Sequence, residues 1–230
     1  MELSRRLRSV ADGVSPGNRV ADIGTDHGYI PIFLVQKGIV PSAIAMDVKK
    51  GPLFRARDHI WEQGFEDRIE TRLSDGLEKL KKDEADTIVI AGMGGALMSD
   101  ILERGLPVLS DGKELVLQPQ SEIFKVRHWL HDHRYQIVRE EIIKEEDKFY
   151  FVIVAEPGSQ RFSEEFLYQY GEYLLKEKTP WMKEYLEKES IKYKKILEKL
   201  EKEDSLLVNK RKEELKQQIS LIEKAYQYGM

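Results

Sequence analysis

Cysteine is absent from the 230-residue sequence. Its absence excludes disulfide bonds, thiolate nucleophiles and cysteine-ligated zinc, and it is consistent with a reducing interior. Also absent is an unbroken run of the roughly 18 apolar residues that a membrane-spanning helix requires. The opening residues MELSRRLRSVADGV mix arginines with apolar residues, which is not the pattern of a signal peptide. These absences favour a cytoplasmic protein with no membrane partner.

An excess of positive charge is missing too. The formal net charge is −4, with 37 lysines and arginines against 41 acidic residues. A protein that grips nucleic acid through its overall charge is usually strongly basic. Any contact with phosphate groups must therefore come from a local basic patch.

Short β-branched runs alternate with helical patterns between residues 19 and 155. This alternation is typical of a mostly parallel α/β sheet covered by helices, as in Rossmann-like folds. The connection at 145–148 is too short for a helical crossover, so the last two strands are expected to form an antiparallel hairpin. Strands are expected at 19–23, 42–48, 68–73, 86–92, 113–119, 135–146 and 149–156.

The composition changes after residue 156, which predicts two domains, 1–156 and 157–230. Apolar residues in the second domain recur at spacings of 3, 4 and 7, which predicts two long helices folded into a coiled-coil hairpin, with a break at 201–205. A helix over 163–177, capped by Ser163, is expected to lead into them. The hairpin is either a packing or dimerisation element or an arm that grips RNA. The two stripes are Leu186, Tyr193, Leu197 and Leu200, and Leu215, Ile219, Ile222 and Tyr226.

The segment DIGTDHGYIP at 22–31 joins the first expected strand to a helix. Gly24 and Gly28 allow a sharp turn at a helix start, whose free N–H groups can meet a ligand, although such turns also occur in purely structural roles. A pyrophosphate favours a cradle without negative charge, whereas this loop contains Asp22 and Asp26. The acid pair therefore favours a cationic ligand, and S-adenosylmethionine, with its sulfonium and ammonium groups, fits this requirement.

Three further segments follow in the order that such a cofactor site needs. Asp47 ends the second strand, where a carboxylate can accept the ribose hydroxyls. Asp75, in LSDGL, can accept the adenine amino group, although Ser74 and Asp75 can equally cap a helix. The segment IAGMGG at 90–95 gives a bare backbone at the carboxyl edge of the sheet, where ligands of open parallel sheets collect.

The segments DIGTDHGYIP, AMDVKKGPL, LSDGL, IAGMGG and LQPQ, in this order, resemble the bacterial tRNA N1-methyltransferase family that acts on the adenine at tRNA position 22. The resemblance covers roughly residues 1–156. It implies a class I S-adenosylmethionine-dependent domain, a C-terminal coiled-coil domain and a tRNA substrate. The cofactor residues that it and the loop chemistry assign are Asp22, Gly24, Thr25, Asp26, His27, Gly28, Asp47, Val48, Ser74, Asp75, Gly76, Ala91, Gly92 and Met93.

The residues after the fourth strand are compatible with a ring nitrogen as methyl acceptor. AGMGG offers no side-chain acceptor for an exocyclic amine, whereas a ring nitrogen has a lone pair and needs mainly orientation. Asp26 or His27 is the expected proton acceptor or charge stabiliser. Tyr29 is either a stacking platform for the splayed-out base or a core aromatic. The catalytic candidates are Asp26, His27, Tyr29 and Met93, the last facing the transferred methyl group.

The opening helix places Arg5, Arg6 and Arg8 off its apolar stripe. Facing away from the core, they would form a phosphate clamp or simply a solvated face. Further basic positions are Lys49, Lys50, Arg127, His128, His131 and His133. For the three histidines, surface or capping roles are favoured over metal binding, because no nearby acid completes a ligand set. No metal is expected.

Three other functions remain open at this point. The chain could methylate a small molecule or a protein, or it could be an RNA-binding adaptor without catalysis. A dinucleotide oxidoreductase is disfavoured by the acidic loop and by the missing third glycine of that fingerprint. The oligomeric state stays open, and a monomer is favoured.

Overall fold

The computed structural model describes residues 1–110, 112–201 and 205–229. The chain divides into two compact units, Met1–Gln160 and Arg161–Met230. The first unit extends four residues beyond the boundary expected from composition. Its last residue is tied to it, because the Gln160 side-chain oxygen accepts a 2.8 Å hydrogen bond from the backbone N–H of Ile137.

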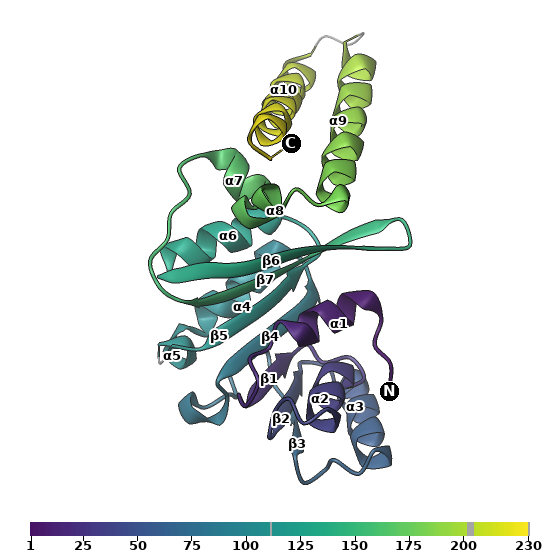
Figure 1. Ribbon diagram of the computed structural model, residues 1–230, viewed down its shortest axis with the longest axis vertical. Coiled ribbons are helices and arrows are strands. Elements are labelled where there is room, and N and C mark those ends of the chain that lie inside the picture. Colours follow the sequence, from purple (N-terminus) through teal and green to yellow (C-terminus); the bar gives the residue numbers. More distant parts are fainter. Residues whose placement is uncertain (111, 202–204, 230) are drawn as a thin grey trace. The chain divides into compact units, whose positions relative to one another are not determined.

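A seven-stranded sheet forms the centre of the first unit, in the order β3-β2-β1-β4-β5-β7-β6 (Figure 1). Strands β1 to β5 pair in parallel, and β7 is antiparallel to both β5 and β6. All seven expected strands and the antiparallel hairpin are confirmed. Their bounds are β1 Val20–Ile23, β2 Ala43–Asp47, β3 Ile69–Leu73, β4 Thr87–Met93, β5 Glu114–Pro119, β6 Tyr135–Glu145 and β7 Lys148–Pro157.

Helices cover both faces of this sheet. Figure 1 shows α1, α2 and α3 on one face and α4 and α6 on the other. The sandwiched strands are buried on both faces, which explains their continuous apolar runs. Helix α2 is apolar almost all round because it lies inside the unit. The bounds are α1 Arg5–Asp12, α2 Tyr29–Gln36, α3 Lys50–Glu62, η1 Lys82–Glu84, α4 Gly95–Arg104, α5 Leu106–Leu109 and α6 Ile123–Asp132.

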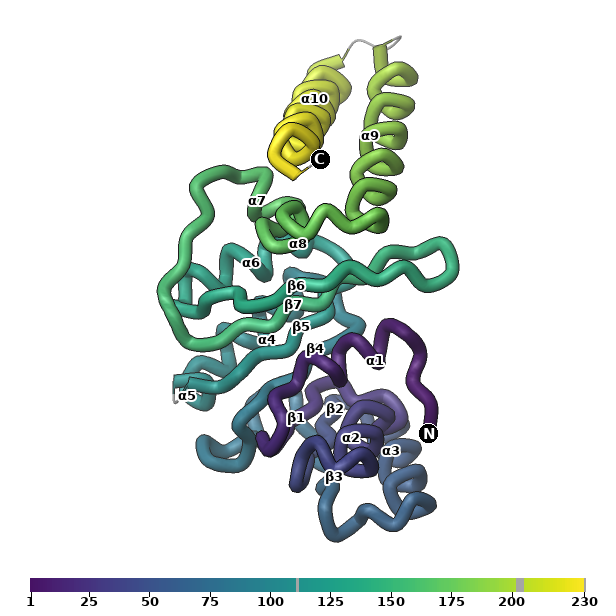
Figure 2. The backbone as a smooth tube through the Cα atoms, viewed as in Figure 1, coloured from purple at the N-terminus to yellow at the C-terminus, as the bar shows by residue number. Residues whose placement is uncertain are grey.

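The second unit is helical, with α7 Glu165–Tyr170, α8 Glu172–Glu177, α9 Pro180–Leu200 and α10 Leu206–Gly229. The expected hairpin of two long helices is confirmed, and Figure 2 traces α9 and α10 side by side. The single helix expected over 163–177 is wrong. Glu164, rather than Ser163, precedes the first turn of α7, and Gly171 ends it with a φ of 85°, so α8 starts anew.

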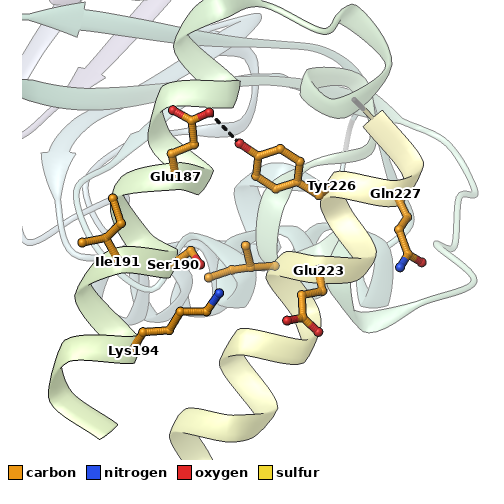
Figure 3. A pocket seen from close by; sticks show the side chains of 8 residues that line it. Glu187, Ser190, Ile191, Lys194, Glu223, Tyr226 and Gln227 are labelled. Atoms are coloured by element: carbon orange, nitrogen blue, oxygen red, sulfur yellow. Dashed lines mark hydrogen bonds between the residues drawn. The ribbon is translucent and has the colours of Figure 1, made fainter. Parts of the chain in front are cut away.

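The hairpin stripes are only partly buried within the second unit. Leu186, Leu215 and Ile222 are buried, together with Met182 and Ala225, which the stripes did not include. A pocket of about 510 Å³ opens between α9 and α10 (Figure 3). The Tyr226 hydroxyl donates a 3.0 Å hydrogen bond to the Glu187 carboxylate in the pocket wall. Its lining mixes both charges with apolar groups.

Two of the basic positions expected from the sequence lie on helix α6 and are buried. Arg127 is completely buried rather than exposed, and its Nε lies 2.7 Å from Oε1 of Glu140, which is also buried. His131 is buried too, with Nε2 2.9 Å from Oε1 of Gln160. His133 does cap the C-terminus of α6. The sequence could not reveal the acid from β6 that compensates Arg127.

Removing one partner of the Arg127–Glu140 pair takes away the opposite charge that lies 2.7 Å from the other buried group. We therefore expect Glu140→Gln to lower the free energy of unfolding by about 3–5 kcal/mol, measured by urea denaturation. Arg127→Met combined with Glu140→Met should regain most of this loss, because neither charge remains. Lys125→Gln, which breaks an exposed ion pair with Glu122, the residue before the helix, should cost less than about 1 kcal/mol. A Glu140→Gln cost no larger than that of Lys125→Gln would contradict this account.

Candidate active site

A cavity of about 650 Å³ opens at the carboxyl ends of β1, β2, β3 and β4. Residues far apart in the sequence meet there because parallel strands end at one edge of the sheet. Twelve of the fourteen residues expected to bind the cofactor line it, and only His27 and Gly28 do not. The twelve are Asp22, Gly24, Thr25, Asp26, Asp47, Val48, Ser74, Asp75, Gly76, Ala91, Gly92 and Met93.

The loop after β1 is fixed by backbone hydrogen bonds. The N–H groups of Gly24 and Thr25 donate to the Met46 carbonyl at 2.8 and 2.9 Å. Gly24 has a φ of 78°, which disfavours any side chain. A Cβ there would also lie 2.2 Å from the terminal methyl group of Met93. The glycine therefore allows the loop to pack against the end of β4.

Asp22 is the buried acid of the cavity. Burial raises the pKa of its carboxyl from 3.8 to about 6, and the charge of Asp47 adds to the rise while the Thr25 hydroxyl opposes it. The carboxylate lacks water to solvate its charge. A cation placed beside it would stabilise the ionised form, so this position favours a positively charged ligand group.

Asp26 lies at the mouth of the cavity and already has a cationic neighbour. Its Oδ1 is 2.9 Å from a guanidinium nitrogen of Arg55, which also lines the cavity, and 3.5 Å from Nε2 of His27. The sequence interpretation missed Arg55. The negative charge of Asp26 is thus partly compensated, which leaves Asp22 as the stronger attraction for a cation.

His27 and Tyr29 stack together beside the mouth of the cavity. Their ring centres are 5.1 Å apart with planes 5° from parallel, and His59 of α3 stacks on both. Tyr29 lines the cavity and is 39 % exposed, so its interpretation as a core aromatic is wrong. His27 has a φ of 81° and stays outside the lining. It contacts two residues that line the cavity, Asp26 and Tyr29.

The remaining two acids differ in their surroundings. Asp47 accepts a 2.7 Å hydrogen bond from the N–H of Lys49, which orients its carboxylate at the end of β2. Asp75 forms an exposed ion pair with Arg104 at 3.2 Å. The Ser74 hydroxyl donates to the Gly76 carbonyl and accepts from the N–H of Lys79, so it stabilises the local turn.

Of the three arginines expected to face away from the core, Arg5 and Arg8 are exposed and Arg6 is not. Arg6 points into the cavity rather than away from the core, and its Nη1 donates a 2.9 Å hydrogen bond to Oε1 of buried Gln118. Arg8 is paired with Asp12 at 2.8 Å, and Arg5 is exposed outside the cavity. Arg6 faces inward because Gln118, on β5, accepts its hydrogen bond. The periodicity of the helix that contains Arg6 could not predict this acceptor.

Gln118 and Gln120 are functional candidates that the residue-by-residue interpretation passed over. Gln118 is buried at the end of β5, and Gln120 lines the cavity. A Cβ on Gly92 would lie 3.8 Å from both Nη1 of Arg6 and Nε2 of Gln120, so these groups flank the bare backbone after β4. The LQPQ segment contained this signal, because two amides bracket a strand end at the carboxyl edge.

Two absences concern only the part of the chain that the structure describes. Within it, no group of three or more histidine, cysteine or acidic side chains could hold a metal ion. No helix within it has the length and apolar character to cross a membrane.

The fold and this cavity define the class of protein first. The sheet order, the antiparallel end and the ligand-sized cavity at the strand ends are those of Rossmann-like methyltransferases. The sequence model of the tRNA (adenine(22)-N(1))-methyltransferase family matches residues 20–224. The chain belongs to this family.

Individual relatives agree with this assignment. The tRNA (adenine(22)-N(1))-methyltransferase of Bacillus subtilis is 42 % identical over 160 residues, which cover 70 % of this chain and 67 % of the relative. A Streptococcus pneumoniae structure in complex with S-adenosyl-L-methionine has a TM-score of 0.84, at 36 % identity, covering 97 % and 99 % of the two chains. A Mycoplasma capricolum structure with S-adenosyl-homocysteine has a TM-score of 0.88, at 29 % identity, covering 100 % of both.

The buried acid predicts a stability penalty that depends on pH. The folded carboxyl of Asp22, with a pKa of about 6, keeps its proton at a pH where the unfolded chain, near 3.8, has lost it. Stability is therefore lost as the pH rises from about 4 to 6. We expect Asp22→Asn, which does not titrate, to raise the free energy of unfolding at pH 7.5 by about 2–3 kcal/mol in urea denaturation. At pH 5 the gain should be smaller by about 1 kcal/mol.

Asp75→Asn is the matched control, because Asp75 lines the same cavity but is exposed. It should give no such gain. Equal stability of wild type and Asp22→Asn at both pH values would contradict the assignment of a destabilising buried carboxylate.

Proposed function

We propose that this protein transfers a methyl group from S-adenosylmethionine to N1 of the adenine at position 22 of tRNA. The observation that carries the proposal is a single cavity with two chemically different parts. Asp22, Asp26, Asp47 and Asp75 supply negative charge, whereas Arg6 and Gln120 flank the bare backbone at Gly92. The relatives named above support the reaction and its substrate.

The lining residues fit the cofactor. S-adenosylmethionine supplies, when bound, an electrophilic methyl group on a sulfonium centre. Asp22 and the loop at 24–26 would face its positive end. Asp47 would accept hydrogen bonds from the ribose hydroxyls, and Asp75 would accept one from the adenine amino group. Gly24 leaves the loop free of a side chain where it meets Met93. Gly92 and Met93, which line the cavity at the end of β4, would border the methyl group of the bound cofactor.

Arg6, Tyr29 and Gln120 form the side that receives the target base. N1 lies on the Watson–Crick edge, so the adenine must leave its stack before it can react. Tyr29 offers an exposed ring at the cavity mouth for stacking. Arg6, held by Gln118, and Gln120 offer donors that orient the base beside Gly92. Orientation of a ring nitrogen with a free lone pair can supply most of the catalysis.

Methylation at N1 leaves the adenine positively charged until an amino proton departs. Asp26, at the cavity mouth, is the group that stabilises this charge or accepts the proton. His27 acts as a positioning residue, because it lies 3.5 Å from Asp26 and outside the cavity lining. Arg55 holds the Asp26 carboxylate from the other side.

The proposed setting follows from the substrate. The enzyme works in the cytoplasm, where tRNA is available. Residues 1–156 form the cofactor-binding domain in this proposal, and residues 157–230 form the accessory helical domain.

The direct test offers the full-length protein labelled S-adenosylmethionine and two unmodified tRNA transcripts that differ only in carrying A or G at position 22. We expect label in the A22 transcript alone and a reverse-transcription stop at that base, because N1-methylation blocks its pairing edge. Label in the G22 transcript, in free adenosine or in protein would contradict the proposed substrate. Cofactor binding without any transfer would indicate an adaptor.

Variants separate the two sides of the cavity in the same assay. Asp47→Asn should weaken cofactor affinity, measured by calorimetry. Arg6→Gln should lower kcat/KM for tRNA by up to about 100-fold, because the base loses an orienting donor, while cofactor affinity stays unchanged. Asp26→Asn should lower kcat more than His27→Ala does. Arg8→Gln is the control for Arg6, since its side chain pairs with Asp12 outside the cavity.

A further inference from the structure

Two large aromatic side chains stand exposed on α3, outside the cavity. Trp61 is 70 % exposed and Phe54 is 51 % exposed. Arg57 lies between them in the sequence, with its guanidinium carbon 4.8 Å from the centre of the Phe54 ring. Positions three, four and seven apart share one side of a helix, so these three side chains form one row, here called the α3 stripe. Ala56 and Ile60, on the other side, are buried.

The α3 stripe is not explained by the packing of the first unit. An isolated exposed apolar residue is ordinary, whereas two exposed aromatic side chains on one helical face, with an arginine between them, need an explanation. Aromatic rings alternating with cations are the pattern by which proteins hold unpaired nucleotides, with bases stacked on rings and phosphates on cations.

Charge around the α3 stripe favours a polyanion. Lys49 and Lys50 precede it and Arg57 lies within it, whereas the charge of the neighbouring Arg55 is paired with Asp26. The acids of the same helix are Asp58, next to Arg57, and Glu62 at its end. The cations are concentrated toward the N-terminal half of the helix, which is the half nearest the cavity.

The α3 stripe begins near the mouth of the cavity but on another side of the helix. Lys49, Pro52 and Arg55 line the cavity from the start of α3, and Phe54 is next to Arg55 in the chain. Pro52 and Arg55 are three residues apart and share a side of the helix that the stripe does not occupy. Trp61 lies two helical turns beyond Phe54, roughly 10 Å along the axis. A nucleic-acid strand that delivers one base into the cavity therefore reaches the stripe by crossing the first turns of α3.

We propose that the α3 stripe binds nucleotides of the substrate RNA that flank the target adenine. Bases stack on Phe54 and Trp61, and Arg57 contacts the phosphate between them. The inference rests on the proposed function, because it needs an RNA whose target base is splayed out. Neighbours of a splayed-out base lose a stacking partner, and the exposed rings replace it.

The test measures the affinity of the full-length protein for unmodified tRNA at fixed salt, using Phe54→Ala, Trp61→Ala, Trp61→Phe and Trp61→Leu. We expect each alanine variant to raise the Kd by about tenfold, which corresponds to about 1.4 kcal/mol. Trp61→Phe should retain most of the affinity because it keeps a ring, whereas Trp61→Leu should not. Affinity for S-adenosylmethionine, measured separately, should be unchanged in all four.

Two further measurements separate stacking and phosphate contact from other causes. Binding of tRNA should quench part of the tryptophan fluorescence in wild type, and Trp61→Phe should lose that part while still binding. Arg57→Gln should weaken binding and reduce its salt dependence. Lys37→Gln, at an exposed lysine after the far end of α2, should change neither.

Unchanged tRNA affinity in both alanine variants would overturn the α3 stripe proposal. Equal affinity of Trp61→Leu and wild type would overturn it in favour of a simple apolar contact. Association of the free protein that Trp61→Ala abolishes would assign the stripe to a second copy of the chain. Because these readouts are binding affinities, they are separate from the methylation assay, whose failure would instead contradict the proposed function.

Discussion

The burial of one carboxylate, Asp22, at the end of β1 is the constraint on which the site depends. The strand is sandwiched at the centre of the sheet, so the side chain of Asp22, its last residue but one, lies in a place with little water. Backbone hydrogen bonds from Gly24 and Thr25 to Met46 fix the loop that follows. The folded chain cannot move the acid into solvent without breaking this turn. A cation bound in the cavity would compensate the charge of Asp22.

The second constraint is the meeting of distant segments beside Gly92. Arg6 comes from the first helix and Gln118 from the fifth strand, and their hydrogen bond joins the start of the chain to the carboxyl edge. Because of this contact, the Arg6 guanidinium lines the cavity and gives it a cationic side opposite the acidic one. In the proposed reaction that side faces the base, whereas the acidic side faces the cofactor. One cavity thereby brings donor and acceptor together.

The sheet, its antiparallel end and the long helical hairpin were predictable because they depend on local periodicity and on connection length. The acidic and glycine-rich positions were predictable because strand ends of a parallel sheet converge. What the sequence could not give were pairings between distant polar groups. Arg6 was expected to face solvent, but its hydrogen bond to Gln118 turns it inward. Arg127 was expected to be an accessible basic residue, but it is buried with Glu140 as its partner. Gly171 divided an expected helix because a left-handed φ outweighed the apolar pattern around it.

The most direct test of the account is the pH dependence of S-adenosylmethionine binding, measured by calorimetry between pH 5 and 7. If the ionised Asp22 carboxylate, with a pKa of about 6 in the free protein, meets the cationic end of the cofactor, affinity should be highest near pH 7. It should fall about tenfold by pH 5, with proton release on binding near pH 6. Asp22→Asn should bind weakly and without this dependence. An affinity that is constant across this range would contradict the central claim.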